Sequence, residues 1–334
     1  MKFIDLFAGI GGFRLGLEQS GHKCVGFCEI DKYAEQAYRI MHNIKEDEWF
    51  VKDIKKIDAK RMPKADIWTF GFPCQDISIA GYRKGFEGKR SSLFFSVIEL
   101  LKNIQNKPKY LIIENVKNLL SINGGWDFAK VLIALDEVGY DAEWQILNSK
   151  DFGVPQHRER IFIIGHLRGT STRKIFPIRK TSKNNIKQFI NKKEGIKIFV
   201  DISRENTKIT QTARAMTATY FKGMSNHGGS RSGVLEIRPI ITPQRKTKKQ
   251  NGRRIKKTGE PMFSLTAREP HGIILKEGNN IRIRKLTPRE AFRLQGFPDK
   301  YIDKIIDKFS DTQLYKMAGN GVTVNVIKEI GDRL

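Results

Sequence analysis

Short apolar runs alternate with helical patterns through residues 1–178, and this alternation is the strongest constraint on the fold. The apolar runs predict strands at Lys2–Ala8, Lys23–Glu29, Asp66–Gly71, Tyr110–Glu114, Trp144–Leu147 and Arg160–Gly165. The helical patterns lie between them, at Gly12–Ser20, Lys32–His42, Leu93–Ile104 and Ala129–Val138. Strands that alternate with helices predict an α/β fold, with a doubly wound, mostly parallel sheet that binds ligands at the carboxyl ends of its strands.

The pattern changes near Gly169, which predicts a second and smaller domain. From there to about Ile283 the chain is rich in Lys, Arg, Thr, Ser and Gly and has few sustained apolar stretches, so we expect short strands and loops there. A helix start returns at Thr287-Pro288-Arg289-Glu290, with a capping Thr, a Pro in the first turn and a Glu three residues after the cap. We therefore expect a first domain over 1–178, a hinge over 284–315, and a C-terminal helix over 316–334 that returns to the first domain.

The charge of the chain indicates a polyanionic partner. The net charge is +25, of which residues 1–178 contribute +5 and residues 179–334 contribute +20. Clustered Lys and Arg neutralise phosphates and release condensed counterions, although a merely solvated Lys-rich surface is the alternative. No apolar run approaches the roughly 18–20 residues of a membrane span, and no secretory signal is expected. Three cysteines, an odd number, favour a reducing cytoplasm over a disulfide framework.

A glycine-rich turn at Asp5–Phe13 lies between the first predicted strand and helix. Glycines let backbone amides approach a cofactor closely, and Glu29, about 20 residues on, could accept hydrogen bonds from ribose hydroxyls. Asp53 could take the amino group of an adenine. An unrelated glycine-rich junction would look similar. S-Adenosylmethionine is favoured over NAD because nothing indicates a second nucleotide half-site.

Three strand ends carry side chains with chemical potential. Cys74 follows the strand Asp66–Gly71, Glu114 ends another strand, and Arg158 and Arg160 stand where a third begins. Each has an ordinary structural alternative, as a packed loop cysteine, a helix cap or surface ion pairs. Carboxyl ends of parallel strands meet at one edge, so together they favour a site. Cys24 and Cys28 lie within a strand and are expected to be buried apolar residues; no metal site is predicted.

With these motifs, the sequence closely resembles the DNA cytosine-5 methyltransferases of bacterial restriction–modification systems and phages. The resemblance covers nearly the whole chain. Its motifs are Asp5–Phe13, Gly71–Gln75, Glu114-Asn115-Val116, Gln156–Arg160, Arg284–Gly296 and Gly319-Asn320-Gly321-Val322. It departs from the family at His157, where Lys or Arg is more usual, and at Gly321, where Ser or Ala is commoner.

The resemblance implies an S-adenosylmethionine-dependent DNA (cytosine-5-)-methyltransferase. Cys74 would attack carbon 6 of a cytosine flipped out of duplex DNA, and Glu114 would act at the ring N3. Arg158 would provide a positive environment for the thiolate, and Arg160 would bind the O2 carbonyl. The family's variable region, here 179–283, would read the DNA sequence. The rivals are an RNA cytosine methyltransferase of the same fold and a catalytically inactive DNA-binding protein.

The resemblance also implies binding residues. Those for the cofactor are Phe7, Gly9, Ile10, Gly11, Glu29, Ile30, Asp53, Ile54, Pro73, Leu93, Asn320 and Val322. Those for DNA are Gln75, Ser78, Arg83 and Lys84, in a loop expected to close over the flipped base, and Arg214 and Arg268 in the second domain. We expect a protein that is monomeric on double-stranded DNA and works in a bacterial cytoplasm, in restriction–modification, on a phage or as a solo enzyme.

Overall fold

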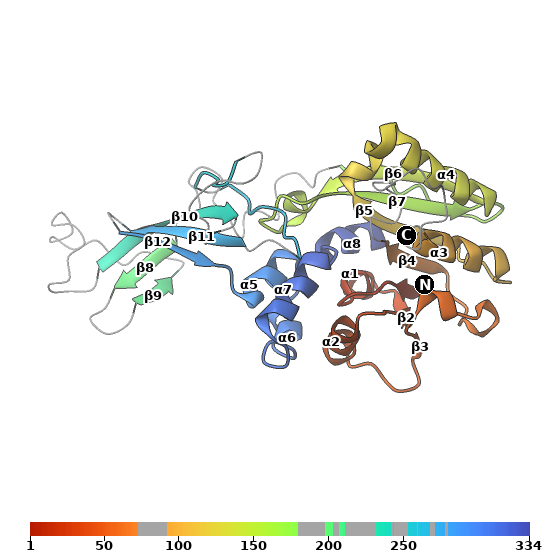
Figure 1. Ribbon diagram of the computed structural model, residues 1–334, viewed down its shortest axis with the longest axis horizontal. Helices are drawn as coiled ribbons and strands as arrows, with labels where there is room; N and C mark the ends of the chain where they lie inside the picture. Colours follow the sequence, from red (N-terminus) through yellow and green to blue (C-terminus); the bar gives the residue numbers. More distant parts are fainter. Residues whose placement is uncertain are drawn as a thin grey trace. The chain divides into compact units, whose positions relative to one another are not determined.

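The computed structural model describes ten stretches of the chain and divides it into two compact units (Figure 1). The described residues are 1–72, 92–179, 198–202, 207–210, 231–241, 243, 253–258, 260–267, 271–277 and 280–334. Unit 1 comprises Met1–Val154, Arg158–Lys180 and Pro288–Leu334, and unit 2 comprises Pro155–His157 and Thr181–Thr287. The chain therefore leaves unit 1 and returns to it.

Unit 1 is built on a seven-stranded sheet with the order β3-β2-β1-β4-β5-β7-β6. Its strands are β1 (Lys2–Leu6), β2 (Lys23–Cys28), β3 (Trp49–Val51), β4 (Ile67–Gly71), β5 (Tyr110–Val116), β6 (Tyr140–Asn148) and β7 (Glu159–Leu167). All neighbouring pairs from β3 to β5 are parallel, whereas β7 runs antiparallel to both β5 and β6. The predicted doubly wound, mostly parallel sheet is confirmed.

Alternating side chains of the central strands supply a core on each face of this sheet. On β5, Leu111 and Ile113 belong to one buried cluster, which includes Phe94 and Phe128 from helices on that face. Tyr110 and Ile112 belong to the other cluster. Because both faces are covered, the central strands are almost continuously apolar.

The helices of unit 1 cover these two faces. They are α1 (Gly12–Gln19), α2 (Lys32–His42), α3 (Ser92–Asn103), α4 (Trp126–Glu137), α5 (Pro288–Leu294), α6 (Asp299–Ile302), α7 (Asp311–Asn320) and α8 (Val324–Gly331). Short 3-10 turns lie at Ile54–Lys56, Ala59–Arg61, Lys117–Leu120, Ile122–Gly125 and Ser149–Phe152. Helix α8 lies beside α1, and a Cβ at Gly16 would stand 2.6 Å from Ile327 Cβ (Figure 1).

Unit 2 contains a five-stranded antiparallel sheet with the order β12-β11-β10-β8-β9. Its strands are β8 (Ile198–Ile202), β9 (Thr207–Thr210), β10 (Arg231–Ile241), β11 (His271–Glu277) and β12 (Asn280–Lys285). The fully buried Gln156 belongs to this unit, where its side chain accepts a hydrogen bond from the backbone of Leu265. The small, mostly β character of this part agrees with the class expected from its composition.

Several predicted elements differ from the observed ones in their extent. The helix expected at Lys32–His42 has those bounds, but the strand expected at Trp144–Leu147 extends over Tyr140–Asn148. Strand β3 and helix α6 were not predicted, and neither was the start of α7 at Asp311. The single helix expected over 316–334 is wrong, because α7 ends at Asn320 and α8 begins at Val324. Helix α7 begins after Ser310, whose hydroxyl accepts from the backbone N–H of Gln313. The functional division into a first domain, hinge and recognition region stays a prediction.

Candidate active site

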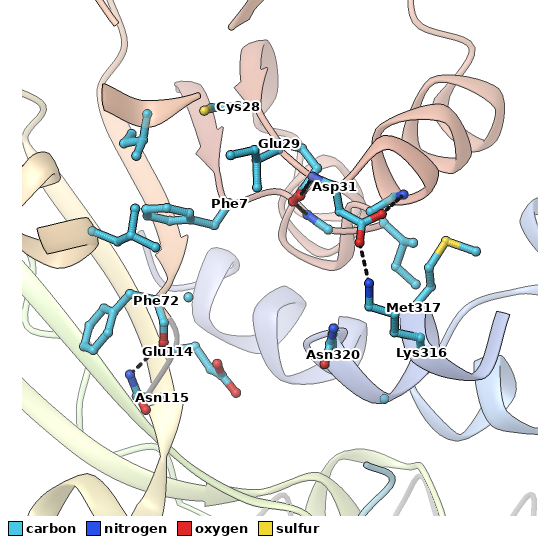
Figure 2. A pocket seen from close by; sticks show the side chains of 18 of the residues that line it. Phe7, Cys28, Glu29, Asp31, Phe72, Glu114, Asn115, Lys316, Met317 and Asn320 are labelled. Carbon is cyan, nitrogen blue, oxygen red and sulfur yellow. Dashed lines mark hydrogen bonds and ion pairs between the residues drawn. The ribbon is translucent and has the colours of Figure 1, made fainter. Parts of the chain in front are cut away.

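A cavity of about 470 Å³ lies at the carboxyl ends of strands β1, β2, β4 and β5, within unit 1 (Figure 2). Side chains from α7, far along the chain, complete its wall. Among the residues predicted to form a site, those that line it are Phe7, Gly9, Ile10, Glu29, Ile30, Asp53, Ile54, Leu93, Glu114, Arg158, Arg160 and Asn320. The cavity is large enough for a nucleotide-sized ligand.

The turn after β1 has the backbone conformation that its glycines allow. Gly9 and Gly11 have φ values of 55° and 78°, which glycine adopts without steric cost. Gly11 precedes α1 and lies behind the lining, because a Cβ there would stand 2.2 Å from His42 Nε2. Val322 likewise lies in the core behind Gly12. These two predicted cofactor residues are therefore not among the lining residues.

Glu29 is a buried carboxylate at the end of β2, with 8% of its surface exposed. Its Oε2 accepts from the backbone N–H of Gly9 and its Oε1 from that of Asp31, both at 2.7 Å. Burial raises the pKa of Glu29, while these hydrogen bonds oppose the rise. Each carboxylate oxygen can accept a further hydrogen bond, so this group suits a ligand with two adjacent hydroxyls.

Glu114 and Arg160 form an ion pair on another part of the cavity wall, with Arg160 Nε 3.0 Å from Glu114 Oε1. Strand β5 carries the glutamate and the neighbouring antiparallel β7 carries the arginine. In the parallel register of β4 and β5, Glu114 lies opposite Gly71. The carboxylate therefore stands beside the strand end from which the chain continues to Pro73 and Cys74.

Arg158 is 3% exposed, and its guanidinium reaches the end of α7. Its Nη2 donates to the carbonyls of Gly319, at 3.3 Å, and Gly321, at 2.9 Å. Burial and the nearby Arg160 lower the pKa of Arg158 to about 9, so it remains charged at neutral pH. In these contacts Arg158 holds the segment that carries Asn320, a role that was not foreseen; its predicted role beside a thiolate stays a prediction.

Three residues to which the sequence analysis assigned no role also line the cavity: Asn115, Asp31 and Lys316. Asn115 is 3% exposed, and its Nδ2 donates to the carbonyl of Phe72 at 3.0 Å, just before Pro73 (Figure 2). Asp31 and Lys316, which both line the cavity, form an ion pair. Asn115 stands inside a recognised motif, which could have drawn attention to it, whereas the Asp31–Lys316 contact has no local sequence signal.

Eight predicted residues lie outside the described part of the chain: Pro73, Cys74, Gln75, Ser78, Arg83, Lys84, Arg214 and Arg268. Cys24 and Cys28 are buried, as expected from their positions in a strand, and burial raises the pKa of each thiol to about 12. Neither is therefore a candidate for a reactive thiolate.

Metal-ligand clusters and membrane-spanning helices are both missing from the residues that the structure describes. Among them, no group of three or more His, Cys, Asp or Glu side chains is arranged to hold a metal ion. No helix in those same stretches has the length and apolar character needed to cross a membrane.

The chain matches one protein family over its whole length and has curated relatives of similar length. The model of the family described as C-5 cytosine-specific DNA methylase matches residues 1–334. The orphan methyltransferase M.SPRI of Bacillus phage SPR is 32% identical, over 99% of this chain and 96% of its own length. The type II methyltransferase M.HhaI of Haemophilus parahaemolyticus is 34% identical, over 99% of this chain and 93% of its own.

The fold also has solved counterparts. A putative DNA modification methyltransferase encoded within an E. coli prophage superposes with a TM-score of 0.61 at 20% identity. The match covers 99% of this chain and 97% of the other. At that identity the likeness concerns the fold, and it agrees with the α/β architecture described above.

Proposed function

Because the chain belongs to the C-5 cytosine-specific DNA methylase family, we propose that Cys74 is the nucleophile with which it methylates carbon 5 of cytosine, using S-adenosylmethionine. The protein is a DNA cytosine-5 methyltransferase, and DNA is its substrate. The observation that carries the proposed mechanism is one cavity lined by the Glu114–Arg160 pair, the glycine turn and the buried carboxylate of Glu29.

A cysteine nucleophile is needed because carbon 5 of cytosine is unreactive by itself. Carbon 5 of cytosine is too weak a nucleophile to take a methyl group directly. Addition of the Cys74 thiolate to carbon 6 moves the electrons of the 5,6 double bond toward carbon 5, which becomes electron-rich. After methylation, loss of the proton from carbon 5 restores the double bond and expels the Cys74 thiolate.

Glu114 and Arg160 would stabilise the charge that develops on the ring. A carboxyl of Glu114 that shares a proton with cytosine N3 acts as a general acid, and Arg160 donates to the O2 carbonyl. Their 3.0 Å contact supports this assignment, because it preorganises both groups before the base enters. Arg158 would favour the thiolate form of Cys74 through its charge.

The cofactor cavity fits S-adenosylmethionine, which supplies an electrophilic methyl group on sulfur. The buried Glu29 suits the two ribose hydroxyls, and Asp53 and Ile54 would hold the adenine. Gly9 offers open space where a side chain would stand, since nothing lies within 4 Å of its Cβ position. Phe7, Ile10, Ile30, Leu93 and Asn320 would line the rest, with Gly11, Pro73 and Val322 supporting it.

DNA must be deformed for this chemistry to occur. The target cytosine has to leave the stack, which costs on the order of a few kcal/mol. We propose that Gln75, Ser78, Arg83 and Lys84 contact the DNA around the flipped base. Residues 179–283, with Arg214 and Arg268, would read the sequence, and one protein molecule would act on each duplex.

A mechanism-based trap tests the nucleophile. A duplex containing 5-fluorocytosine cannot lose a proton from carbon 5 after methylation, so the wild type should remain covalently attached to it in the presence of S-adenosylmethionine. Cys74→Ser should form no adduct and no methylated product, yet still bind DNA in a mobility-shift assay. Cys24→Ser is the matched control, because Cys24 does not line the cavity, and it should be trapped like the wild type. An adduct that persists in Cys74→Ser would exclude Cys74.

A further inference from the structure

The ion pair between Asp31 and Lys316 joins two walls of the cavity that are far apart in the sequence. Lys316 Nζ lies 2.6 Å from Asp31 Oδ2, and both residues line the cavity. Asp31 precedes α2, and Lys316 lies on α7 one turn before Asn320. Figure 2 shows the pair at one end of the cavity and Glu114 at the other.

Asp31 is held in place independently of the lysine. Its Oδ1 accepts from the backbone N–H groups of Tyr33 and Ala34, which caps α2, and only its Oδ2 meets Lys316. Burial by itself would raise the pKa of Asp31, but these hydrogen bonds and the ammonium group lower it. The two backbone hydrogen bonds do not depend on Lys316, so the carboxylate keeps its place when the lysine charge is removed.

The pair is also connected to the carboxylate proposed to bind ribose. The backbone N–H of Asp31 donates to Glu29 Oε1, and Glu29 Oε2 accepts from Gly9, both at 2.7 Å. A continuous chain of contacts thus runs from the glycine turn through Glu29 and Asp31 to α7. Lys316 is the last residue in this series of contacts. It can therefore affect a bound ligand by fixing the position of the cavity wall and by its charge.

The charge of the ligand changes during the reaction. S-Adenosylmethionine carries a sulfonium, an ammonium and a carboxylate, with a net charge of +1, whereas S-adenosylhomocysteine has lost the sulfonium charge and is neutral overall. The cavity is lined by four carboxylates, Glu29, Asp31, Asp53 and Glu114, and by four cationic side chains, Lys52, Arg158, Arg160 and Lys316. Loss of one cation therefore leaves a net negative lining. Asp31 and Glu114 have cationic partners on the wall, Lys316 and Arg160. A carboxylate without such a partner attracts a cationic ligand more than a neutral one.

We propose that Lys316 is a specificity-determining residue whose pairing with Asp31 sets the ratio of affinities for the methyl donor and for its demethylated product. By holding α7 against the residue before α2, the pair increases the affinity for both ligands. By neutralising Asp31, it reduces the preference for the cationic donor. This inference rests on the proposed use of S-adenosylmethionine.

Calorimetric titration of the full-length protein with each ligand separates these two effects. Lys316→Met keeps the aliphatic stem but removes the charge, and it should weaken both ligands while raising the donor preference roughly threefold to tenfold. Asp31→Asn keeps the helix cap. It leaves Lys316 unopposed and should shift the ratio the other way. The double variant should return to the wild-type ratio, because both charges are gone.

Lys328→Met is the matched control. Lys328 on α8 pairs with Asp332, which follows that helix, and neither residue lines the cavity, so the ratio should stay at the wild-type value. If both single variants weaken the two ligands equally, Lys316 only holds the wall and the inference is wrong. A wild type that binds neither ligand would instead contradict the proposed cofactor, so the two failures are distinguishable.

Discussion

The cavity carries carboxylates in two different electrostatic settings, and these settings suit different tasks. Glu29 accepts two backbone N–H groups, and the described residues supply it with no ion pair, so its remaining lone pairs can meet neutral hydroxyls. Glu114 is paired with a guanidinium at 3.0 Å, so a proton shared with a ligand there is balanced by a fixed positive charge. Environment, more than residue type, separates the proposed roles.

Asp5 gives a pH-dependent contribution to stability. It is fully buried, and burial raises its pKa to about 8 although the Thr69 hydroxyl donates to it at 2.9 Å. The folded state therefore retains a proton that the unfolded chain releases above its ordinary pKa of 3.8. The contribution is full below that value and is lost as pH rises toward 8.

We accordingly expect Asp5→Asn to gain stability relative to the wild type as pH rises. Urea unfolding of both proteins at several pH values between about 5 and 8 measures this difference in the free energy of unfolding. A difference that is independent of pH would show that Asp5 titrates alike in the folded and unfolded states.

Gly321 stands where the family more often has Ser or Ala, and its geometry tolerates a side chain. Its φ is −66°, and a Cβ there would meet no atom closer than Ala318 O at 3.4 Å. Gly321→Ala should therefore raise the free energy of unfolding by about 0.4–1 kcal/mol, through a less flexible unfolded chain. Activity should persist, because the backbone carbonyl that Arg158 binds remains.

Gly12 provides the contrast for that substitution. A Cβ at Gly12 would stand 2.6 Å from the carbonyl oxygen of Val322, which is backbone and cannot move aside easily. Gly12→Ala should lower the melting temperature, whereas Gly321→Ala should not. Equal effects of the two substitutions would contradict the packing described for this turn.

At the scale of elements, α7 is held by buried polar contacts as well as by apolar packing. The fully buried Gln295 donates from Nε2 to the carbonyl of Ala318 at 2.7 Å and accepts from Thr323 at 3.0 Å. Thr323 in turn contacts the Ser149 hydroxyl at 2.8 Å. Together with Arg158, these groups fix both ends of the Gly319–Gly321 segment.

Replacing Gln295 should loosen this segment. Gln295→Leu leaves the Ala318 carbonyl without that donor in a buried place, so we expect a loss of about 1–3 kcal/mol in the free energy of unfolding. Weaker binding of S-adenosylmethionine should accompany it, because Asn320 lies between the affected residues. The exposed Gln36 on α2 is the control, and Gln36→Leu should change stability by less than about 0.5 kcal/mol.

The elements that sequence reasoning predicted share a local signal. Strands β1, β2, β4 and β5 are short apolar runs bounded by turns, and α2 has a capping Asp31 and an amphipathic pattern. Helix α7 has a weak apolar pattern and ends in Gly319-Asn320, so much of what fixes it comes from distant groups such as Gln295 and Arg158. Contacts of this kind join residues that are far apart in the sequence, so the residues next to α7 in the sequence do not reveal them.

The same limit applies to the site. Glu29, Glu114 and Arg160 were predicted because strand ends meet at one edge and because motifs of the family mark them. The pairing of Asp31 with Lys316 spans 285 residues of sequence, and no pattern within either segment indicates its partner. Nor does the motif reveal that Arg158 donates to backbone carbonyls of α7.

At the scale of the whole molecule, the net charge of +25 predicts how binding to DNA responds to salt. Each phosphate that Lys or Arg neutralises releases counterions, so affinity should fall at least about a hundredfold between roughly 50 and 200 mM salt. Fluorescence anisotropy with a labelled duplex measures this, and binding of S-adenosylhomocysteine should change far less. Salt-independent DNA binding would exclude a dominant role for the basic residues.

Unit 1 is assembled from three stretches of chain, and the last of them, Pro288–Leu334, brings Lys316 and Asn320 to the cavity and packs α8 on α1. On the ribosome, the glycine turn and Glu29 emerge first, but the wall opposite them is synthesised nearly 300 residues later. A nascent chain, or one cut short by a premature stop codon, therefore lacks part of the wall of the cavity proposed to bind the cofactor. On the proposed use of this cavity, a chain that ends before Lys316 should bind no S-adenosylmethionine and methylate no DNA.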